Sequence, residues 1–544
     1  MREANNNTRQ LSRVAPLLCV LPLYAPLAGA FQLKFDDPEL KGYWDNTLKY
    51  SSAFRVAGQD STLTADANAD DGNRNLDKGL VSNRFDLFSE LGLSYQGFGF
   101  RLSGAAWYDD VYNKGNDNDS PATLNHLGQS DEFSDETEKL AGRKAELLDA
   151  FIYGSGDIAG HRASLRLGKH TLLWGQSLFF PTNGIAYGQA PIDVLKALSV
   201  PNTRAAELFR PINQFSTQFQ INDTTSLAAF YQLDWEKTRL APVGSFFSIA
   251  DVIGEGNERI IIGQDAGLGD AYGNIMLYRG KSRDASKSGQ FGVSLTLRPG
   301  DGDTEYGLYA LRFNNRLPQL YAYPGKSFQQ LPGQVGEFAE VYSEGIKMLG
   351  ASFSTSVGEA NFAGELSTRF DMPLRSNDPV MVLDPNDDSR NRHAKGRSLH
   401  AQLSTIYLVP RTPLWESATL VGELAWHRLM SVTDNREQFN KRDFTDSATG
   451  VRFVLEPSYF QALPGLDLFV PIGAGYTHGK SPIDPAFNNY NADGGGDMSI
   501  GLRGVYDGVW NGLINYTHFY GSAGASTNAY RDRDFISISI QRAF

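Results

Sequence analysis

The chain has 544 residues, with 50 Lys and Arg against 62 Asp and Glu and a formal net charge of −12 at pH 7. This acidic balance argues against nucleic acid as a partner, and a hydrophobic fraction of 41% excludes an intrinsically disordered chain. Gly (55), Phe (33) and Tyr (24) are frequent and Met (7) is scarce, which favours β structure with many turns over a helical enzyme.

The N-terminus has the pattern of a secretory signal peptide. Arginines precede an apolar run that ends in the small residues Ala28-Gly29-Ala30. We expect cleavage after Ala30, which divides the chain into a signal peptide, 1–30, and a mature part, 31–544. A membrane anchor is the alternative, but the apolar run is shorter than the roughly 18 residues of a spanning helix and is interrupted by prolines. Cys19 is not preceded by the small residue that a lipoprotein signal requires. It is the only cysteine, so cleavage of the signal peptide leaves the mature part without a thiol.

The mature part repeats short segments in which apolar and polar residues alternate, as they do in the strands of a transmembrane β-barrel. The first segment, 44–56, places Trp44 and Phe54 on one face and Asp45 and Arg55 on the other. Each segment alone is a weak signal, so the prediction depends on their repetition. The further segments lie at 84–95, 98–109, 214–221, 227–235, 291–297, 304–313, 343–356, 360–371, 398–408, 417–428, 448–460, 466–476, 497–507, 511–520 and 533–544.

Two features distinguish a barrel from a secreted β-sandwich or propeller, whose strands also alternate. Short turns such as 96–97 and 357–359 alternate with long polar loops such as 57–82 and 237–288, as outer-membrane topology requires. Charged residues also recur on the face that a soluble sandwich would bury at high cost, whereas a barrel lumen solvates them. We therefore predict an all-β fold, a transmembrane antiparallel β-barrel of about 18 strands (16–18) with long extracellular loops.

The last strand predicts the cellular location. It places Ile536, Ile538, Ile540 and Phe544 on one face. A C-terminal Phe that closes an alternating strand is the signal that the outer-membrane barrel assembly machinery reads. Together with the signal peptide, this strand predicts residence in the outer membrane of a Gram-negative-type cell, with membrane lipid and the assembly machinery as partners.

The connection 171–211 differs from the other long loops because it is rich in apolar residues and carries little charge. An extracellular loop should be polar, so we expect this segment to fold into the barrel mouth or lumen as a constriction or plug. Pro181, Asn183-Gly184 and Pro191 would supply its turns, and Asp193 is placed to cap a short helix. The alternative is that the segment only packs against neighbouring loops at the rim.

The predicted substrate path uses this segment and the strand before it. Trp174, Phe179 and Phe180 would offer an apolar surface to a passing solute. Together with Asp193 and the inward Arg166 they form the predicted path or constriction.

No constellation points to catalysis. The chain has no Gly-x-Ser-x-Gly elbow, no His-Glu-x-x-His zinc motif and no phosphate-binding loop. His427 and Glu423 share an inward face, which a hydrogen-bonded lumen pair explains without catalysis. Two acidic loops, 66–72 and 116–119, invite a calcium interpretation, but the first places its Gly one position late for an EF-hand, and solvated mobile loops explain both. We predict no enzyme activity, no cofactor and no metal.

Several motifs resemble those of the outer-membrane β-barrel family catalogued as domain of unknown function 1302, over nearly all of the mature part. Gln176 departs from the family, which usually carries an acid there, and so does Lys169, near which a Gln is expected. The matching stretches are Arg166–His170, Leu173–Ser177, Pro191–Asp193, Ala229–Gln232, Gly244–Phe247, Gly364–Ser367 and Asp532–Phe544.

The resemblance implies a function that composition and periodicity do not give. Members are linked to hydrophobic compounds and are often encoded beside an inner-membrane transporter of the resistance-nodulation-division type and a periplasmic lipoprotein. We therefore expect an outer-membrane channel or transport component for hydrophobic compounds or lipids that works with such partners. The alternatives are a docking scaffold without conductance and an outer-membrane hydrolase.

Overall fold

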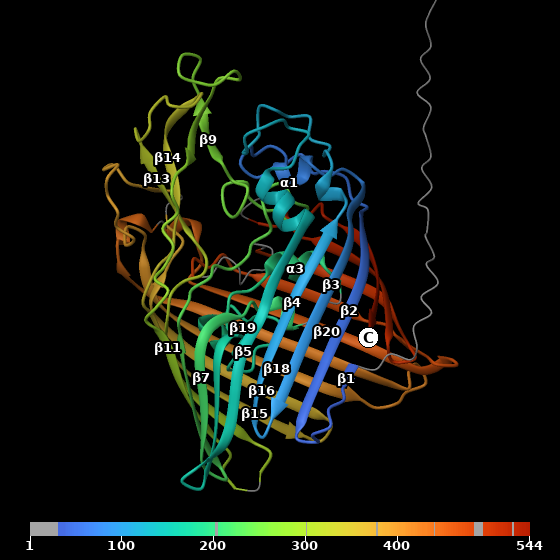
Figure 1. Ribbon diagram of the computed structural model, residues 1–544. Coiled ribbons are helices and arrows are strands. Elements are labelled where there is room, and N and C mark those ends of the chain that lie inside the picture. The colour runs from blue at the N-terminus through green and yellow to red at the C-terminus, as the bar shows by residue number, and fades with distance from the viewer. Residues whose placement is uncertain are drawn as a thin grey trace, which may run out of the picture.

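An antiparallel sheet that closes on itself forms the body of the protein (Figure 1). The computed structural model describes residues 31–201, 205–300, 302–376, 379–439, 441–483, 493–524 and 527–544; the predicted signal peptide lies outside them. The sheet has 20 segments. β1 (Phe31–Leu33) is a three-residue segment that pairs with β2 alone and is not part of the closed wall, and β21 and β22 are halves of one strand. Eighteen strands therefore close the barrel, as the sequence predicted.

The strands follow one another around the wall, and β2 pairs with both β3 and β25 to close it. Pro471, which cannot donate to a ladder, lies between β21 and β22. The strands are β2 (Leu40–Arg55), β3 (Gly79–Tyr95), β4 (Phe98–Asp109), β5 (Arg143–Ile158), β6 (His161–His170), β7 (Ile212–Asn222), β8 (Thr225–Gln232), β11 (Gln290–Leu297), β12 (Glu305–Phe313), β15 (Ile346–Val357), β16 (Ala360–Pro373), β18 (Lys395–Val409), β19 (Ser417–Asp434), β20 (Ser447–Leu463), β21 (Leu466–Phe469), β22 (Ile472–His478), β23 (Gly495–Tyr506), β24 (Trp510–Tyr520) and β25 (Phe535–Ala543).

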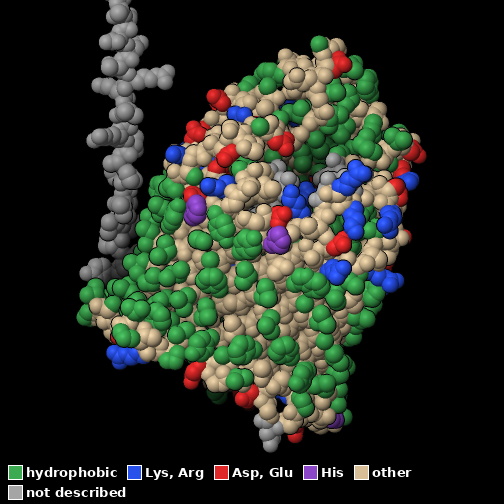
Figure 2. All heavy atoms as spheres, turned by 180° about the vertical axis from the view of Figure 1, so that it is seen from behind, with side chains coloured by type: hydrophobic (Ala, Val, Ile, Leu, Met, Phe, Trp, Pro, Cys, Tyr) green, Lys and Arg blue, Asp and Glu red, His purple; other side chains and the backbone are tan. Residues whose placement is uncertain are grey.

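The wall presents its apolar residues outward and its polar residues inward. Leu48 and Phe85 are 43% and 54% exposed on the outside, whereas Lys49 between the same strands is only 5% exposed. Figure 2 shows hydrophobic side chains spread over the wall, with charged side chains gathered mainly toward the end that carries the long loops. This arrangement, the reverse of a soluble protein, is that of a transmembrane barrel. Among the described residues, no helix is both long and apolar enough to cross a membrane.

The long connections meet at one end of the barrel, here called the long-loop end, and build a second sheet of five strands there (Figure 1). Its order is β17-β13-β14-β10-β9, and β10 pairs with β14 in parallel. Alternate side chains form a small apolar cluster on each face, around Tyr321 and Phe338. The sequence predicted only long polar loops here and did not predict these strands. The strands are β9 (Arg259–Gln264), β10 (Asn274–Arg279), β13 (Gln319–Pro324), β14 (Gln334–Val341) and β17 (Val380–Met381).

Helices are short and occur only in the connections of the described chain. Those after β6 belong to the segment that the sequence singled out. The helices are α1 (Asp71–Arg74), η1 (Val111–Asn113), α2 (Asp135–Thr137), η2 (Glu138–Gly142), η3 (Ile185–Gly188), α3 (Val194–Ser199), α4 (Ala205–Leu208), η4 (Arg436–Gln438) and η5 (Lys441–Asp443).

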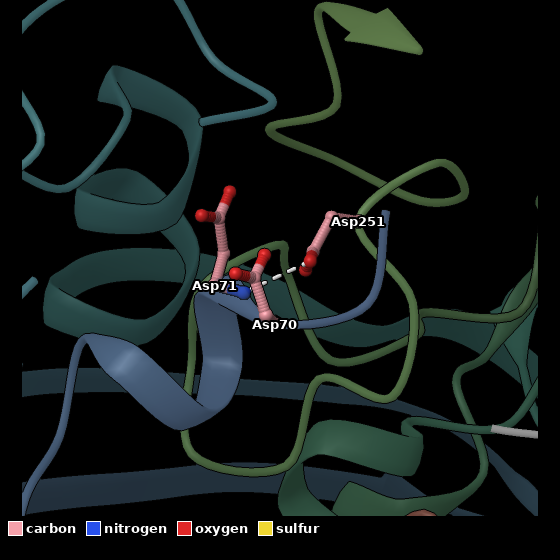
Figure 3. Close-up of side chains that lie close together, drawn as sticks. All are labelled: Asp70, Asp71 and Asp251. Atoms are coloured by element: carbon pink, nitrogen blue, oxygen red, sulfur yellow. Dashed lines mark hydrogen bonds between the residues drawn. The ribbon is translucent and has the colours of Figure 1, made fainter. Parts of the chain in front are cut away.

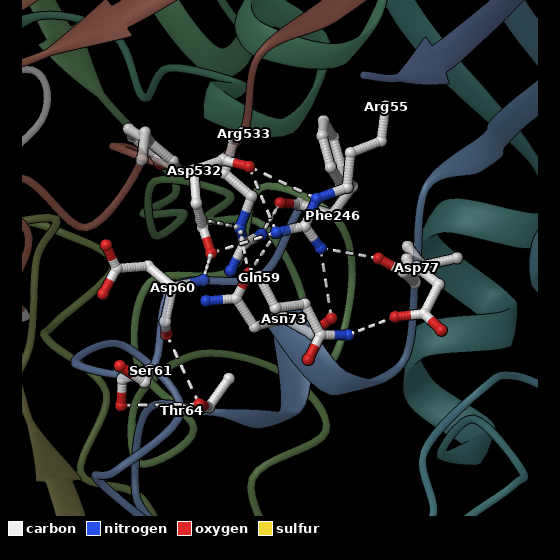
Figure 4. Close-up of polar contacts among 12 residues, drawn as sticks. Arg55, Gln59, Asp60, Ser61, Thr64, Asn73, Asp77, Phe246, Asp532 and Arg533 are labelled. Atoms are coloured by element: carbon white, nitrogen blue, oxygen red, sulfur yellow. Dashed lines mark hydrogen bonds and ion pairs between the residues drawn. The ribbon is translucent and has the colours of Figure 1, made fainter. Parts of the chain in front are cut away.

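Two of the family-like motifs meet at the long-loop end (Figure 4). Arg55, at the end of β2, forms an ion pair with Asp532 at 3.0 Å and donates to the side-chain oxygen of Asn73 at 2.8 Å. Arg533 donates to the same oxygen at 2.9 Å and to the carbonyl of Phe246. The Asp532–Phe535 and Gly244–Phe247 stretches are therefore structural: they tie the chain end to the first and fourth long connections.

Candidate functional site

The segment 171–211, here called the inserted segment, lies against the inner wall of the barrel. Glu423 of β19 faces inward and accepts backbone N–H groups of Leu178 at 3.2 Å, Phe179, and Phe180 at 2.9 Å. Glu365 of β16 accepts those of Gln176 and Ile185, the latter at 2.8 Å. Charge-assisted bonds of this kind are stronger than neutral ones, so two carboxylates fix one face of the segment through its backbone.

Arg369 of β16 binds the carbonyl groups of the same turn. Its guanidinium donates to the carbonyls of Thr182, Asn183 and Gly184 at 2.9, 2.8 and 3.0 Å, and it lies 4.8 Å from the ring centroid of Tyr187. Carboxylates bind the N–H groups and a guanidinium binds the carbonyls. The turn is thereby satisfied from both sides in a buried setting where unpaired groups would be costly.

Two histidines converge on the tip of this turn. His400 of β18 and His427 of β19 place Nδ1 at 2.9 and 3.2 Å from the side-chain oxygen of Asn183. Because an amide oxygen only accepts, both imidazoles donate from Nδ1. The sequence suggested that His427 and Glu423 form a hydrogen-bonded pair. In the structure each of them binds a different part of the inserted segment, and both hold that segment in place.

Gly175 explains the local backbone at the start of the segment. It has φ of +95°, and a Cβ there would overlap the Oε1 atom of Glu365. Only glycine combines this conformation with so close an approach. The Trp174-Gly175 motif therefore lets the chain turn directly over the carboxylate.

The base of the segment is closed by Gln189. Its side-chain oxygen accepts the N–H of Trp174 at 2.5 Å, and its carbonyl accepts from Gln232 at 2.7 Å and from Arg316 at 3.4 Å. Burial lowers the pKa of Arg316 to about 10, so the guanidinium remains charged at neutral pH. The two ends of the 174–189 stretch are thereby joined to each other and to the wall.

The predicted path residues occupy different environments. Trp174 is half-buried and packs on Phe230 and Tyr309, with ring centroids 5.1 and 6.1 Å apart. Phe179 is half-buried beneath the Arg452 guanidinium, at 5.8 Å. Phe180 is only 2% exposed and packs with two alanines of the wall, so the expectation that it would offer a surface to solute was wrong.

Other apolar side chains of the segment are exposed where Phe180 is not. Leu173 and Leu178 are each 40% exposed. The sequence showed that the segment is rich in apolar residues, but it could not show which of their side chains the turn would bury.

Asp193 and Arg166 also lie in contrasting positions. Asp193 is fully buried, caps α3 by accepting the N–H of Lys196 at 2.9 Å as predicted, and pairs with Arg239 at 2.6 Å. Arg166 points inward from β6 and is exposed, with its guanidinium 5.8 Å from the Phe151 ring. Arg166 is therefore open to a solute, whereas Asp193 secures the helix.

A small cavity of about 150 Å³ lies beside α3 and is lined by cationic side chains. Most of its charges are paired: Arg239 contacts Glu146, Arg210 contacts Glu236 at 2.6 Å, and Lys237 contacts Glu255 at 2.6 Å. The basic residues of the lining are Lys144, Arg210, Lys237 and Arg239.

Comparison with known proteins identifies the family. The family model described as "Protein of unknown function (DUF1302)" matches residues 11–544, so the chain belongs to this family, as its motifs indicated. No curated protein matches the sequence.

Three solved structures illustrate what this chain resembles at low sequence identity. OccAB2 of Acinetobacter baumannii is 10% identical, with 92% of this chain and 98% of that chain covered and a TM-score of 0.42. The outer membrane channel DcaP of the same organism is 9% identical, with 95% and 100% covered and a TM-score of 0.39. A BenF-like porin from Pseudomonas fluorescens Pf-5 is 8% identical, with 93% and 98% covered and a TM-score of 0.43.

Proposed function

We propose that this member of the DUF1302 family is an outer-membrane channel whose lumen is narrowed by the inserted segment. The observation that carries the proposal is the anchoring of residues 176–185 by inward side chains of three neighbouring wall strands, β16, β18 and β19. A barrel of this strand number encloses a lumen wide enough for a channel. A segment held on the inner wall then decides what passes.

The proposed cargo is a hydrophobic compound or lipid. Support comes from Leu173 and Leu178, two exposed apolar side chains of the inserted segment, and from the aromatic group of Trp174, Phe230 and Tyr309. The family resemblance points to the same cargo class. It also suggests the partners: an inner-membrane transporter of the resistance-nodulation-division type and a periplasmic lipoprotein.

The proposed location is the outer membrane, reached after cleavage behind Ala30. Leu40 begins the first barrel strand and Ala543 ends the last, and both lie at the end of the barrel that carries the short turns. That end faces the periplasm in such barrels. The long-loop end would then face outward. Phe544 exchanges backbone hydrogen bonds with Asn46 at 2.8 and 2.9 Å, which closes the terminal strand on which assembly depends.

A docking scaffold without conductance is the second candidate. The observation that favours it is the dense packing of the anchored turn, in which Asn183 and Ile185 are at most 1% exposed. A wall filled in this way could serve periplasmic partners without passing a solute.

Uptake in a deletion strain separates the two candidates. A panel of labelled hydrophobic compounds is offered to the deletion strain, to the strain complemented with the intact gene, and to one complemented with a variant lacking 178–190. The channel proposal expects loss of uptake of one compound class, restored by the intact gene but not by the variant at equal outer-membrane abundance. Normal uptake of every compound in the deletion strain would contradict it.

A further inference from the structure

Three aspartates of the long-loop end lie together in the interior of the protein (Figure 3). Asp70 and Asp71 begin the short helix α1, and Asp251 comes from the connection after β8. One carboxylate oxygen from each lies within 4.8 Å of the others, and all three residues are 0% exposed. The sequence suggested that 66–72 is a solvated loop, but Asp70 and Asp71 are buried.

Asp251 supplies evidence that is independent of the Asp70-Asp71 pair. It reaches in from a position 180 residues further along the chain, and its Oδ2 accepts the N–H of Asp71 at 2.9 Å. Its Oδ1 is buried and has no hydrogen-bond partner in the described part of the chain. A buried carboxylate oxygen without a donor is costly and calls for a positive ligand.

Few basic side chains contact the group. Arg74 pairs with Asp70, whereas neither Asp71 nor Asp251 has a basic group within 4.0 Å among the described residues, and Arg259 and Arg533 act on them only over a longer distance. Asp71 accepts neutral donors, from Asn118 at 3.3 Å and from the N–H of Asn125 at 3.2 Å, while Oδ1 of Asp70, like that of Asp251, is buried without a hydrogen-bond partner in the described chain. With all three carboxylates ionised, the single guanidinium in contact leaves a formal charge of −2 at the group, which one divalent cation would cancel.

We propose that Asp70, Asp71 and Asp251 form a calcium-binding site that joins the first long connection to the fourth. The ligand chemistry is that of a hard cation, with oxygen ligands only. At Ca–O distances of about 2.3–2.6 Å, two ligands of one ion lie up to about 5 Å apart, so oxygens within 4.8 Å of one another can share one Ca²⁺.

The site would act on structure and not on cargo. Gly72 directly after it packs against the carbonyls of Ser245 and Ser248, where a Cβ would lie 2.8 Å from each oxygen. Asn73 follows and receives Arg55 and Arg533, the network of Figure 4. Calcium bound at the aspartates would therefore clamp the connections that cover the long-loop end.

Calcium binding to the full mature protein in detergent, after removal of metals with a chelator, tests the proposal. The probe is radioactive Ca²⁺ in equilibrium dialysis, with Mg²⁺ in a parallel titration. We expect one Ca²⁺ per chain, an affinity in the range of about 0.1–1 mM that extracellular modules show, and at least a tenfold loss in Asp251→Asn. The matched control is Asp119→Asn, an exposed acid of the neighbouring connection that is not a member of the three-aspartate group.

Each outcome of this experiment decides. Binding that is lost in Asp251→Asn and kept in Asp119→Asn supports the site, as does a rise in unfolding temperature with calcium in the wild type and in Asp119→Asn but not in Asp251→Asn. Absence of bound calcium in the wild-type protein at about 1 mM, a preference for Mg²⁺, or equal binding by Asp251→Asn overturns it. If the Asp251→Asn protein does not assemble, Asp71→Asn is measured in its place. The number of Ca²⁺ ions bound by the wild-type chain tests the site without any variant.

Discussion

Three charged side chains of the wall hold the inserted segment through its backbone, and Asn183 adds contacts through its side chain. Glu365, Glu423 and Arg369 bind N–H and carbonyl groups between 176 and 185. Because the backbone carries these bonds, side chains such as Leu173 and Leu178, which are exposed, can differ without loss of the anchor. This separates the residues that position the segment from those that can meet a solute.

Gly175 is the residue on which this anchoring most depends. In Gly175→Ala, the new Cβ would overlap the Glu365 carboxylate at a backbone conformation that alanine rarely adopts. We expect a loss of about 1–3 kcal/mol in the stability of the segment, measured as faster proteolysis within 171–211 and a lower unfolding temperature.

Gly302→Ala provides the control for that substitution, because a Cβ at Gly302 meets nothing within 4 Å. Equal proteolysis rates in the two variants would contradict the role assigned to Gly175.

At the scale of elements, the five-stranded outer sheet is held by a buried histidine. His393 Nδ1 lies 2.8 Å from the Tyr321 hydroxyl and Nε2 lies 2.7 Å from the Ser343 hydroxyl. The Tyr321 oxygen already accepts the N–H groups of Arg392 and His393, so it donates to Nδ1 and the imidazole is neutral. Burial, with a smaller contribution from Lys395, lowers the pKa of His393 to about 3.

This predicts a pH dependence of the outer sheet. Since the folded pKa lies below the unfolded value of about 6.5, the stabilisation is present above that pH and is lost progressively as the pH falls toward 3, by about 1.4 kcal/mol per unit. Protease resistance of the sheet, compared at pH 7 and pH 4.5, should fall more in wild type than in His393→Gln, which cannot titrate. An identical fall in both would refute the assignment.

The strands show where sequence reasoning succeeds and where it fails. Strict alternation placed β3, β4 and β16 within a few residues of their observed bounds, with Glu365 and Arg369 correctly inward. It did not describe β5, because the register of β5 against β4 shifts between Leu102 and Gly104 and the alternation changes phase. Leu147 and Ile152 therefore both face outward.

The candidate site could be predicted only in part from the sequence, for a related reason. The apolar character of 171–211 and its turn at Asn183-Gly184 are visible in the sequence, but its partners on the wall depend on strand register and tilt. The contact of Asn183 with His400 joins residues 217 positions apart. The outer sheet was missed because its strands are short and because two antiparallel pairs, β9–β10 and β13–β14, are joined by a parallel pairing between distant segments, β10 with β14.

The whole molecule combines three parts with distinct roles. The wall of 18 strands supplies the lumen, the inserted segment lies on its inner face, and the outer sheet and the aspartate group organise the long-loop end. On this account the barrel is a conduit whose passage is set by one anchored segment, and the parts at the long-loop end shape access to it.

Single-channel recording in planar lipid bilayers tests this account most directly. The purified wild-type protein is compared with a variant in which 178–190 is replaced by a short Gly-Ser linker. A matched control replaces 265–273, the tip of the β9–β10 hairpin in the outer sheet. We predict that the first variant has a conductance several times that of wild type, because the lumen is no longer narrowed, while the control conducts as wild type does. Conductance that is unchanged in the first variant, or absent from all three proteins, would contradict the proposal that this barrel is a channel narrowed by its inserted segment.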